Sequence, residues 1–213
     1  MKRIGFLIAL ALAACSPAPA PASKAVPQAA APTVLFVGDS LTAGYGVEPE
    51  EAWPAVLAAD WKRRGLPWRA RNAAVSGATT AGVADEVAWA LTPDVKLVFV
   101  CIGGNDGLRG APLTELKKNV GSLISGLRKR GVRVALAGMK IPPNYGEPYA
   151  RGFAAVFPEL ARENGVAFMP FLLDGVAADP ALNQADGIHP NAAGHRRVAA
   201  AVSAFLDREG LLK

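Results

Sequence analysis

Short apolar runs alternate with longer segments of helical spacing along most of the chain. The apolar runs have the length of strands and cover residues 33–37, 68–74, 95–103, 132–138 and 166–171. The longer segments are long enough for helices and cover residues 52–64, 81–91, 113–130, 149–164 and 192–208. Near-continuous apolar strands separated by helices are typical of a parallel sheet that is covered on both faces. The pattern therefore predicts a three-layer α/β/α domain over residues 33–213, with a parallel sheet of five strands.

The first residues do not follow this pattern. Lys2 and Arg3 precede an uncharged run, residues 4–14, which is too short to span a bilayer but is typical of a secretory signal peptide. Residues 12–15 read Leu-Ala-Ala-Cys and resemble the bacterial lipobox, in which a signal peptidase cuts before a cysteine that receives lipid. We therefore expect a signal peptide over residues 1–14 and a lipidated Cys15. Ordinary cleavage at a small-residue site is the alternative.

Residues 15–32 begin with this cysteine and continue as a low-complexity segment of mainly Ala and Pro. Such a composition cannot bury apolar surface and favours an extended, semi-rigid tether. We expect a periplasm-facing lipoprotein of the bacterial cell envelope, and Ser16 after Cys15 favours the outer membrane by analogy with other lipoproteins. A soluble periplasmic or secreted protein is the alternative. Cys101 lies in an apolar run, where we expect a buried and inert thiol. The chain has two cysteines, so a lipidated Cys15 leaves Cys101 without a partner and no disulfide is expected.

Composition and charge narrow the classes of partner. The chain of 213 residues is 51% hydrophobic and 19% charged, which is ordinary for a globular protein. Its formal net charge of +5 falls to +3 when residues 1–14, with two basic residues, are removed. The remaining basic residues are scattered and form no dense stripe, so we expect no nucleic-acid partner. These patterns do not specify an oligomeric state.

Polar segments follow the predicted strands at the points where catalytic loops would begin. They read "GDS", "VSGATT", "GGND" and "IPPNYG" after the first four strands, and a final loop, "ADGIHPNAAGH", precedes the last helix. In open parallel sheets, ligands bind at the carboxyl ends of the strands. We therefore expect the functional site at this edge of the sheet.

Ser40 follows the first strand and is either a nucleophile or a helix cap. A serine nucleophile needs a base, and the chain has two histidines. His189 follows Asp186 at a spacing of three and precedes Pro190, which suits the first turn of the last helix and lets the carboxylate orient the imidazole. His195 has no acid at a comparable spacing, so we expect it to be a surface or packing residue of that helix.

Two further residues suit an oxyanion hole. Gly77 allows a backbone N–H to approach a reacting centre, and Asn105 offers a side-chain NH2 donor. Each alone also fits an ordinary turn, but together with Ser40 and the Asp186/His189 pair they favour a catalytic edge. A metal site built from Asp186, His189 and His195 fits no closed zinc pattern, so we expect no metal.

These residues fall in four ordered blocks that resemble the GDSL, or SGNH, hydrolase superfamily. The blocks are Gly38-Asp39-Ser40-Leu41, Ser76-Gly77, Gly103-Gly104-Asn105-Asp106 and Asp186-Gly187-Ile188-His189-Pro190. "GDSLTAGYG", "GGNDGLRG", "IPPNYGEPY" and "DGIHPNAAGH" are most similar to the bacterial thioesterase I, lysophospholipase and arylesterase group. Thr42 stands where the second glycine of the α/β-hydrolase G-x-S-x-G motif would be, which argues against that other superfamily.

The resemblance implies a flavodoxin-like sheet of five parallel strands and no cofactor. It implies that Ser40 is the nucleophile, His189 the general base and Asp186 its orienting acid. The backbone N–H groups of Ser40 and Gly77 and the side chain of Asn105 would form the oxyanion hole. The substrates of this group include acyl thioesters, aryl esters and lysophospholipids.

The loops after the third and fourth strands are expected to border an acyl pocket. Leu108, Ile141, Pro142 and Tyr145 would make its wall apolar, which favours acyl or aryl groups over sugars. We therefore expect a serine hydrolase that cleaves carboxylic esters or thioesters through an acyl-enzyme. An O-deacetylase of carbohydrate or cell wall with the same residues is the main alternative, and a surface module that binds a ligand without turnover is another.

Overall fold

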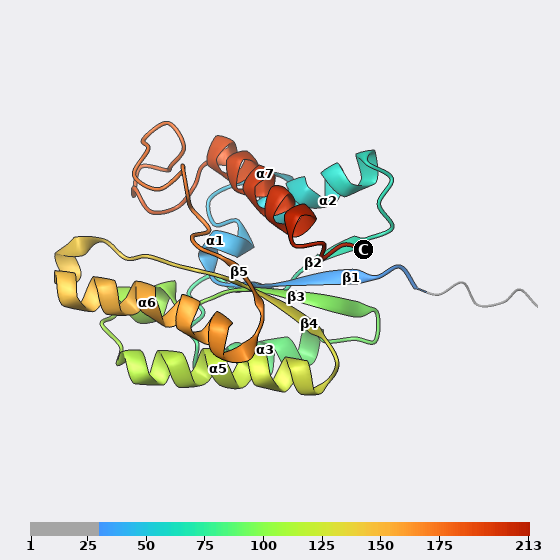
Figure 1. Cartoon of the computed structure of the whole chain (residues 1–213). Coiled ribbons are helices and arrows are strands. Elements are labelled where there is room, and N and C mark those ends of the chain that lie inside the picture. Colours follow the sequence, from blue (N-terminus) through green and yellow to red (C-terminus); the bar gives the residue numbers. More distant parts are fainter. Residues whose placement is uncertain (1–29) are drawn as a thin grey trace, which may run out of the picture.

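Five parallel strands form one sheet at the centre of the protein (Figure 1). The computed structural model describes residues 30–213, so the expected signal peptide (residues 1–14), Cys15 and most of the expected tether lie outside the described residues. The strands are β1 (Thr33–Gly38), β2 (Arg69–Asn72), β3 (Val95–Cys101), β4 (Arg133–Ala137) and β5 (Ala167–Met169). Each coincides with a predicted apolar run, so the prediction of five parallel strands is confirmed.

The strand order is β2-β1-β3-β4-β5. The chain passes from β1 to β2 on one side and then crosses to place β3 on the other side of β1. This change of direction makes the carboxyl ends of β1 and β3 the switch point of the sheet, where an open α/β sheet forms its ligand crevice. Ser40 follows β1 and Asn105 follows β3, so these two residues start from neighbouring strands.

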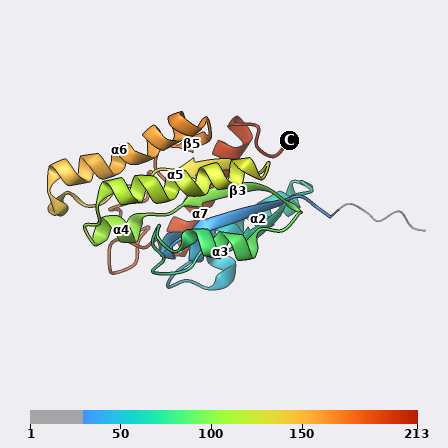
Figure 2. The ribbon, with the colours of Figure 1, turned by 90° about the horizontal axis from the view of Figure 1, so that it is seen from below.

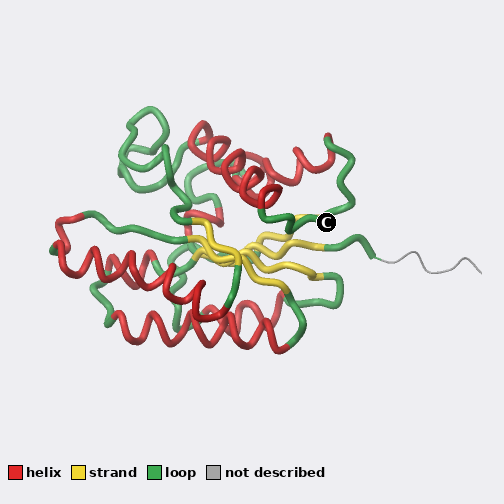
Figure 3. The backbone as a smooth tube through the Cα atoms, in the orientation of Figure 1, coloured by secondary structure: helices red, strands yellow, loops and turns green. Residues whose placement is uncertain are grey.

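Helices cover both faces of the sheet, as Figure 3 shows. One face carries α2 (Trp53–Arg63) and α7 (Ala192–Arg208), which pack against each other. The other face carries α3 (Val83–Ala90), α5 (Leu113–Lys129) and α6 (Glu147–Asn164), seen from below in Figure 2. All five were predicted, with ends that differ by at most two residues and with both ends of α7 as predicted. The structure therefore has the predicted three layers.

Four short helical elements were not predicted. They are α1 (Ser40–Ala43), α4 (Gly104–Leu108) and the 3-10 turns η1 (Pro49–Glu51) and η2 (Pro143–Tyr145). Each is about one turn long, which is too short to display a helical period in the sequence. The helices α1 and α4 begin within three residues of the ends of β1 and β3, so they turn the "GDS" and "GGND" segments across the switch point.

An aromatic cluster fixes α2 and α7 on the sheet. The rings of Phe36 and Trp53 meet nearly at right angles, with centroids 4.9 Å apart, and Phe99 contacts Trp53 and Phe205 in a similar way. Phe36 and Phe99 are register partners on β1 and β3, so the cluster lies directly beneath the strands that lead to the site. Cys101 is fully buried beside them, as expected, and burial raises the pKa of its thiol well above the ordinary value.

Candidate active site

Ser40 is the first residue of α1, directly after β1. The helix is capped by Asp39, whose carboxylate accepts a hydrogen bond from the Leu41 N–H at 3.1 Å. The Ser40 hydroxyl instead lies 2.8 Å from Nε2 of His189. The interpretation of Ser40 as a cap is therefore wrong, because the preceding aspartate satisfies the helix and leaves the hydroxyl facing the histidine.

Asp186 and His189 form one compact turn. The Oδ1 atom of Asp186 accepts hydrogen bonds from the N–H groups of Ile188 and His189, both at 3.0 Å. Its other oxygen, Oδ2, lies 2.7 Å from Nδ1 of His189. The carboxylate of Asp186 therefore contacts the imidazole of His189, as the spacing of three residues predicted. The same carboxylate also stabilises the turn between the two residues.

The predicted bounds of the last helix, residues 192–208, are confirmed, but the expectation that this turn forms the first turn of that helix is wrong. His189 does not lie in the last helix, since α7 begins at Ala192 and is capped by Asn191. Pro190 pairs with Asn183 in an isolated antiparallel bridge, and the carbonyl of His189 accepts a hydrogen bond from the Gln184 N–H. This pairing holds the segment extended, so the helix starts only after it.

The carboxylate of Asp186 stays ionised far into the acid range. Partial burial raises the pKa of this group, but the hydrogen bonds from the His189 amide, the His189 imidazole and the Ile188 amide outweigh burial and lower the pKa to about 2. An ionised acceptor at Nδ1 favours the tautomer that carries its proton there. The other nitrogen, Nε2, is then free to accept the proton of Ser40.

Gly77 and Asn105 lie with Ser40 and His189 around one cavity. Gly77 has φ +84, and a Cβ at this position would meet no atom within 4 Å. Its left-handed backbone, and not crowding by the protein, is therefore what favours glycine. Asn105 donates one hydrogen of Nδ2 to the carbonyl of Ala78 at 2.9 Å, which leaves the second hydrogen for another acceptor.

Asp106 fixes the distance between the loops of Gly77 and Asn105. Its buried carboxylate accepts hydrogen bonds from the backbone N–H and the hydroxyl of Thr80, at 3.0 and 2.7 Å. Asn119 of α5 donates to the same hydroxyl. The loop after β2 is therefore bound to α4 by a buried polar network, which keeps the two candidate oxyanion donors in register.

Asp39 is a residue of the site whose role sequence reasoning missed. Its side chain is 2% exposed, and burial raises the pKa of the carboxyl to about 6 although the Leu41 and Gly104 amides and the nearby His189 lower it. Through these two amides the carboxyl connects the α1 turn to the α4 turn. The "GDS" block contains the residue, but only the burial in the folded chain reveals this connection.

The cavity at the switch point has a volume of about 550 Å³. Leu108, Ile141 and Pro142 line it, as expected. Tyr145 is not among its lining residues: η2 begins at Pro143, which still lines the cavity, but it ends at Tyr145, which is 39% exposed. The expectation that Tyr145 forms part of the wall is therefore wrong.

The segment after β5 supplies a wall that the sequence did not suggest. Its lining residues are Phe171, Leu173, Ala177 and Ala178. This segment also follows a strand of the sheet, so the rule that ligands bind at strand ends could have identified it. With Leu108 and Ile141 it makes most of the cavity apolar, which suits an acyl or aryl group.

Tyr45 covers the catalytic edge from outside. Its ring lies against the imidazole of His189, with centroids 4.7 Å apart and an angle of 43° between the planes. The tyrosine is 53% exposed and lines the mouth of the cavity. Sequence reasoning missed it, because nothing in the "GYG" stretch indicates contact with a residue far away in the chain.

His195 has a structural role, as expected. It is 1% exposed within α7, and its Nδ1 accepts a hydrogen bond from the Trp53 N–H at the start of α2. Burial lowers the pKa of this imidazole to about 4. Within residues 30–213, no group of three or more His, Cys, Asp or Glu side chains could hold a metal ion.

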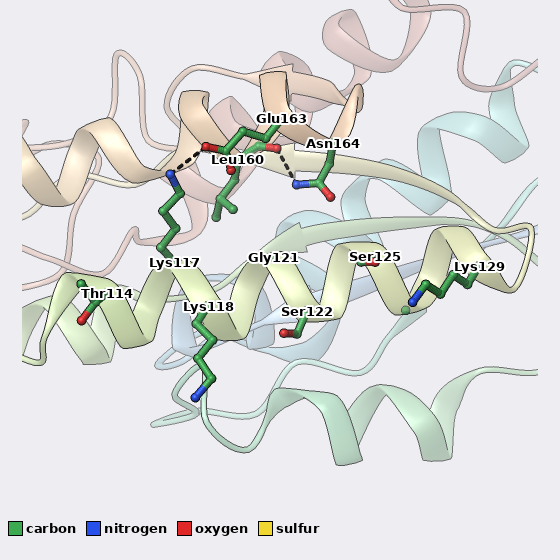
Figure 4. Close-up of a pocket in the computed structure, with 11 residues that line it drawn as sticks. Thr114, Lys117, Lys118, Gly121, Ser122, Ser125, Lys129, Leu160, Glu163 and Asn164 are labelled. Atoms are coloured by element: carbon green, nitrogen blue, oxygen red, sulfur yellow. Dashed lines mark hydrogen bonds and ion pairs between the residues drawn. The ribbon is translucent and has the colours of Figure 1, made fainter.

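A second cavity, of about 790 Å³, lies between α5 and α6, away from the strand ends (Figure 4). Its lining is mainly Lys, Ser, Gly and Thr, and Lys117 is hydrogen-bonded to Glu159 and Glu163 across it. None of its lining residues is a histidine or a cysteine. The cavity at the switch point is therefore the candidate active site.

Comparison with known proteins agrees with this assignment. Residues 36–197 match the sequence model of the GDSL-like lipase/acylhydrolase family. The chain is similar to "Esterase TesA" of Pseudomonas aeruginosa, with 39% identity over 80% of this chain and 86% of that protein. It is also similar to "Thioesterase 1/protease 1/lysophospholipase L1" of Escherichia coli, with 37% identity over 76% of this chain and 77% of that protein.

A solved structure with the same fold is the psychrotrophic esterase EstA of a Pseudoalteromonas species, inhibited by monoethylphosphonate. The two chains superpose with a TM-score of 0.81 and 28% identity, over 84% of this chain and 98% of that one. The family match, these relatives and the shared fold lead to one conclusion: the chain belongs to the GDSL-like lipase/acylhydrolase family and is a serine ester hydrolase of the esterase/thioesterase type.

Proposed function

We propose that Ser40, His189 and Asp186 are the catalytic triad of this hydrolase. The observation that carries the proposal is a chain of two hydrogen bonds, from Ser40 Oγ to His189 Nε2 at 2.8 Å and from His189 Nδ1 to Asp186 Oδ2 at 2.7 Å. This chain ends at an apolar cavity in which a substrate carbonyl can reach the serine. A nucleophile, a base and an orienting acid in hydrogen-bond contact are the elements that acyl transfer requires.

The proposed reaction has two steps. Ser40 Oγ attacks the carbonyl carbon while its proton passes to Nε2 of His189, and the imidazolium then donates that proton to the departing alcohol or thiol. Water repeats the sequence on the acyl-enzyme, with His189 as base, and releases the carboxylic acid. Asp186 remains ionised throughout, since its pKa is about 2, and stabilises the imidazolium.

The proposed oxyanion hole consists of the backbone N–H groups of Ser40 and Gly77 and the side chain of Asn105. All three residues line the cavity. Because Asn105 uses one Nδ2 hydrogen on the Ala78 carbonyl, its amide is held in place before substrate binds. Donors that are fixed in advance stabilise a developing negative charge without reorganisation.

We propose acyl or aryl esters and thioesters as the substrate class, with lysophospholipids among them. The apolar wall formed by Leu108, Ile141 and Phe171 supports an acyl or aryl group over a sugar. The names of the two relatives, an esterase and a thioesterase/lysophospholipase, support the same chemistry. Phosphonate inhibition of the Pseudoalteromonas esterase supports a reactive serine, because phosphonates mimic the tetrahedral intermediate.

Kinetics on p-nitrophenyl butyrate test the proposed triad. The substitutions Ser40→Ala and His189→Ala should each lower kcat on the order of 10⁴-fold to 10⁶-fold, with little change in the thermal midpoint. The substitution Ser122→Ala is the matched control and should leave kcat unchanged. Ser122 is exposed on α5 and lines the second cavity, between α5 and α6 (Figure 4). Wild-type turnover by the Ser40→Ala protein would refute the proposal. An acetylated glycan assayed in parallel would reveal a deacetylase.

We also propose that the protein is held at the cell envelope by lipid on Cys15 and faces the periplasm. The signal-like residues 1–14, the lipobox and the Ala/Pro segment to residue 32 support this proposal, with the hydrolase domain over residues 33–213. None of the helices within residues 30–213 combines the length and apolar character that a bilayer span requires. Fractionation of cells that express the Cys15→Ala variant tests the anchor: release into the soluble fraction supports it, and retention with the wild type contradicts it.

A further inference from the structure

Gln184 joins the two loops that carry Ser40 and His189. Its side-chain Nε2 donates hydrogen bonds to the carbonyl of Tyr45 at 2.7 Å and to the carbonyl of Pro190 at 2.9 Å. Its backbone N–H donates to the carbonyl of His189 at 2.8 Å. One residue therefore binds the backbone next to the histidine and also the segment that leads away from α1.

Gly46 provides a second, independent sign of this junction. It has φ +76, and a Cβ at this position would lie 2.1 Å from Oε1 of Gln184. The glutamine amide therefore packs directly on bare backbone, in space that a side chain at residue 46 would fill. The sequence "GYG" thus keeps a gap that Gln184 occupies.

The segment that Gln184 holds is the one that contacts the imidazole. Tyr45 gives its carbonyl to Gln184 and its ring to His189, with the ring centroids 4.7 Å apart. The hydrogen bonds to Ser40 and Asp186 fix the two nitrogens of the imidazole, and the tyrosine ring limits how far the imidazole tilts out of that line. The ring can do so only while the backbone of Tyr45 stays in place.

We infer that Gln184 is a positioning residue for His189, acting through Tyr45 and through the turn of residues 186–190. The inference rests on the proposed role of His189 as general base. Gln184 is not among the residues that line the cavity, so it acts on catalysis through its neighbours and not through the substrate. An error of about 1 Å in the placement of a catalytic group can cost on the order of 100-fold in rate.

The substitution Gln184→Met tests the inference, because methionine has a similar length but no hydrogen-bond donor. On p-nitrophenyl butyrate, kcat should fall roughly 10-fold to 100-fold while KM changes less than about 3-fold. The folded fraction is measured by circular dichroism at the assay temperature, and kcat is expressed per folded protein. An unchanged kcat would overturn the inference, and so would a rise in KM at constant kcat.

A double substitution tests the route through the tyrosine. If Gln184 acts partly by holding Tyr45, the loss of kcat in the Gln184→Met/Tyr45→Ala protein should be smaller than the product of the two single losses. A loss equal to that product would show that the two residues act independently and would overturn the inferred route.

Two controls establish whether the loss of kcat is specific to Gln184. Asn164→Leu also removes a side-chain amide that donates to a backbone carbonyl, that of Leu160 at 2.9 Å, but at the end of α6 (Figure 4). It should leave kcat unchanged. A Ser40→Ala protein that turns over ester would refute the proposed function itself. An inactive Ser40→Ala protein beside a fully active Gln184→Met protein would refute only the role of Gln184.

Discussion

The hydroxyl of Ser40 and the Nε2 atom of His189 lie 2.8 Å apart, although 149 positions separate the two residues in the chain. The sheet order brings them together, because the β1 turn and the loop before α7 both reach the carboxyl edge. Asp186 contacts the other nitrogen of the imidazole, Nδ1, at 2.7 Å. The proposed mechanism therefore depends on two loops that only the folded sheet brings into contact.

The substitution Asp186→Asn should reduce kcat on the order of 10³-fold to 10⁴-fold, with a small effect on KM. An asparagine can still accept the N–H groups of Ile188 and His189, so the turn is retained. Its amide can donate to Nδ1, which favours the tautomer in which Nε2 carries the proton and cannot act as base. Steady-state kinetics on p-nitrophenyl butyrate check this, and a variant with wild-type kcat would exclude an orienting role.

The substitution Asn105→Ala should lower kcat by about 100-fold to 1000-fold, because it removes the proposed oxyanion donor. It also removes the hydrogen bond to the Ala78 carbonyl, so we expect a loss of roughly 1 kcal/mol in unfolding free energy. Kinetics and urea unfolding of the same preparation separate the two effects. A higher KM with unchanged kcat would assign Asn105 to substrate binding alone.

Bulk added at Leu108 should shorten the acyl chain that the enzyme accepts. Leu108 ends α4 and lines the cavity of about 550 Å³, so tryptophan there would occupy space that a long chain needs. In the Leu108→Trp protein, kcat/KM for long-chain p-nitrophenyl esters should fall roughly 10-fold or more while the value for the acetate ester changes little. Ser122→Trp in the second cavity, between α5 and α6, is the control. An equal loss of kcat/KM for long-chain esters in both proteins would contradict the proposal that the acyl chain lies against Leu108.

His195 should make stability depend on pH. Burial lowers the pKa of its imidazole from 6.5 to about 4, so between these values the unfolded chain binds more protons than the folded one. The contribution of the neutral His195 to the free energy of unfolding is therefore complete above pH 6.5 and is lost as the pH falls to about 4. The total loss is roughly 3 kcal/mol. Urea unfolding of the wild type and of His195→Asn across this range checks it. Parallel curves for the two proteins would contradict the prediction.

Asp39 should change stability with pH in the direction opposite to that of His195. Burial raises the pKa of its carboxyl from 3.8 to about 6, so in this window the folded chain binds more protons than the unfolded one. Stability from this group is greatest below pH 3.8 and falls as the pH rises to about 6. The Asp39→Asn protein lacks this opposing slope, so its stability should fall more steeply with acid than that of the wild type. An identical slope in both proteins would exclude the buried carboxyl as the cause.

Much of this structure could be predicted from the sequence because its strands are continuously apolar and its long helices are periodic. The Asp186/His189 pair was also predictable, since three residues make one local turn. The one-turn helices α1 and α4 were not, because they are shorter than the period that identifies a helix. The roles of Tyr45 and Gln184 were not either, since each depends on contacts with residues more than a hundred positions away.

Mass spectrometry after labelling with a fluorophosphonate tests whether Ser40 is the activated nucleophile. The reagent reacts selectively with a serine that a neighbouring base activates. We predict one adduct on the wild-type protein, on the peptide that contains Ser40, and none on the Ser40→Ala protein. An adduct on another residue, or a wild-type protein that hydrolyses ester while Ser40 stays unlabelled, would contradict it.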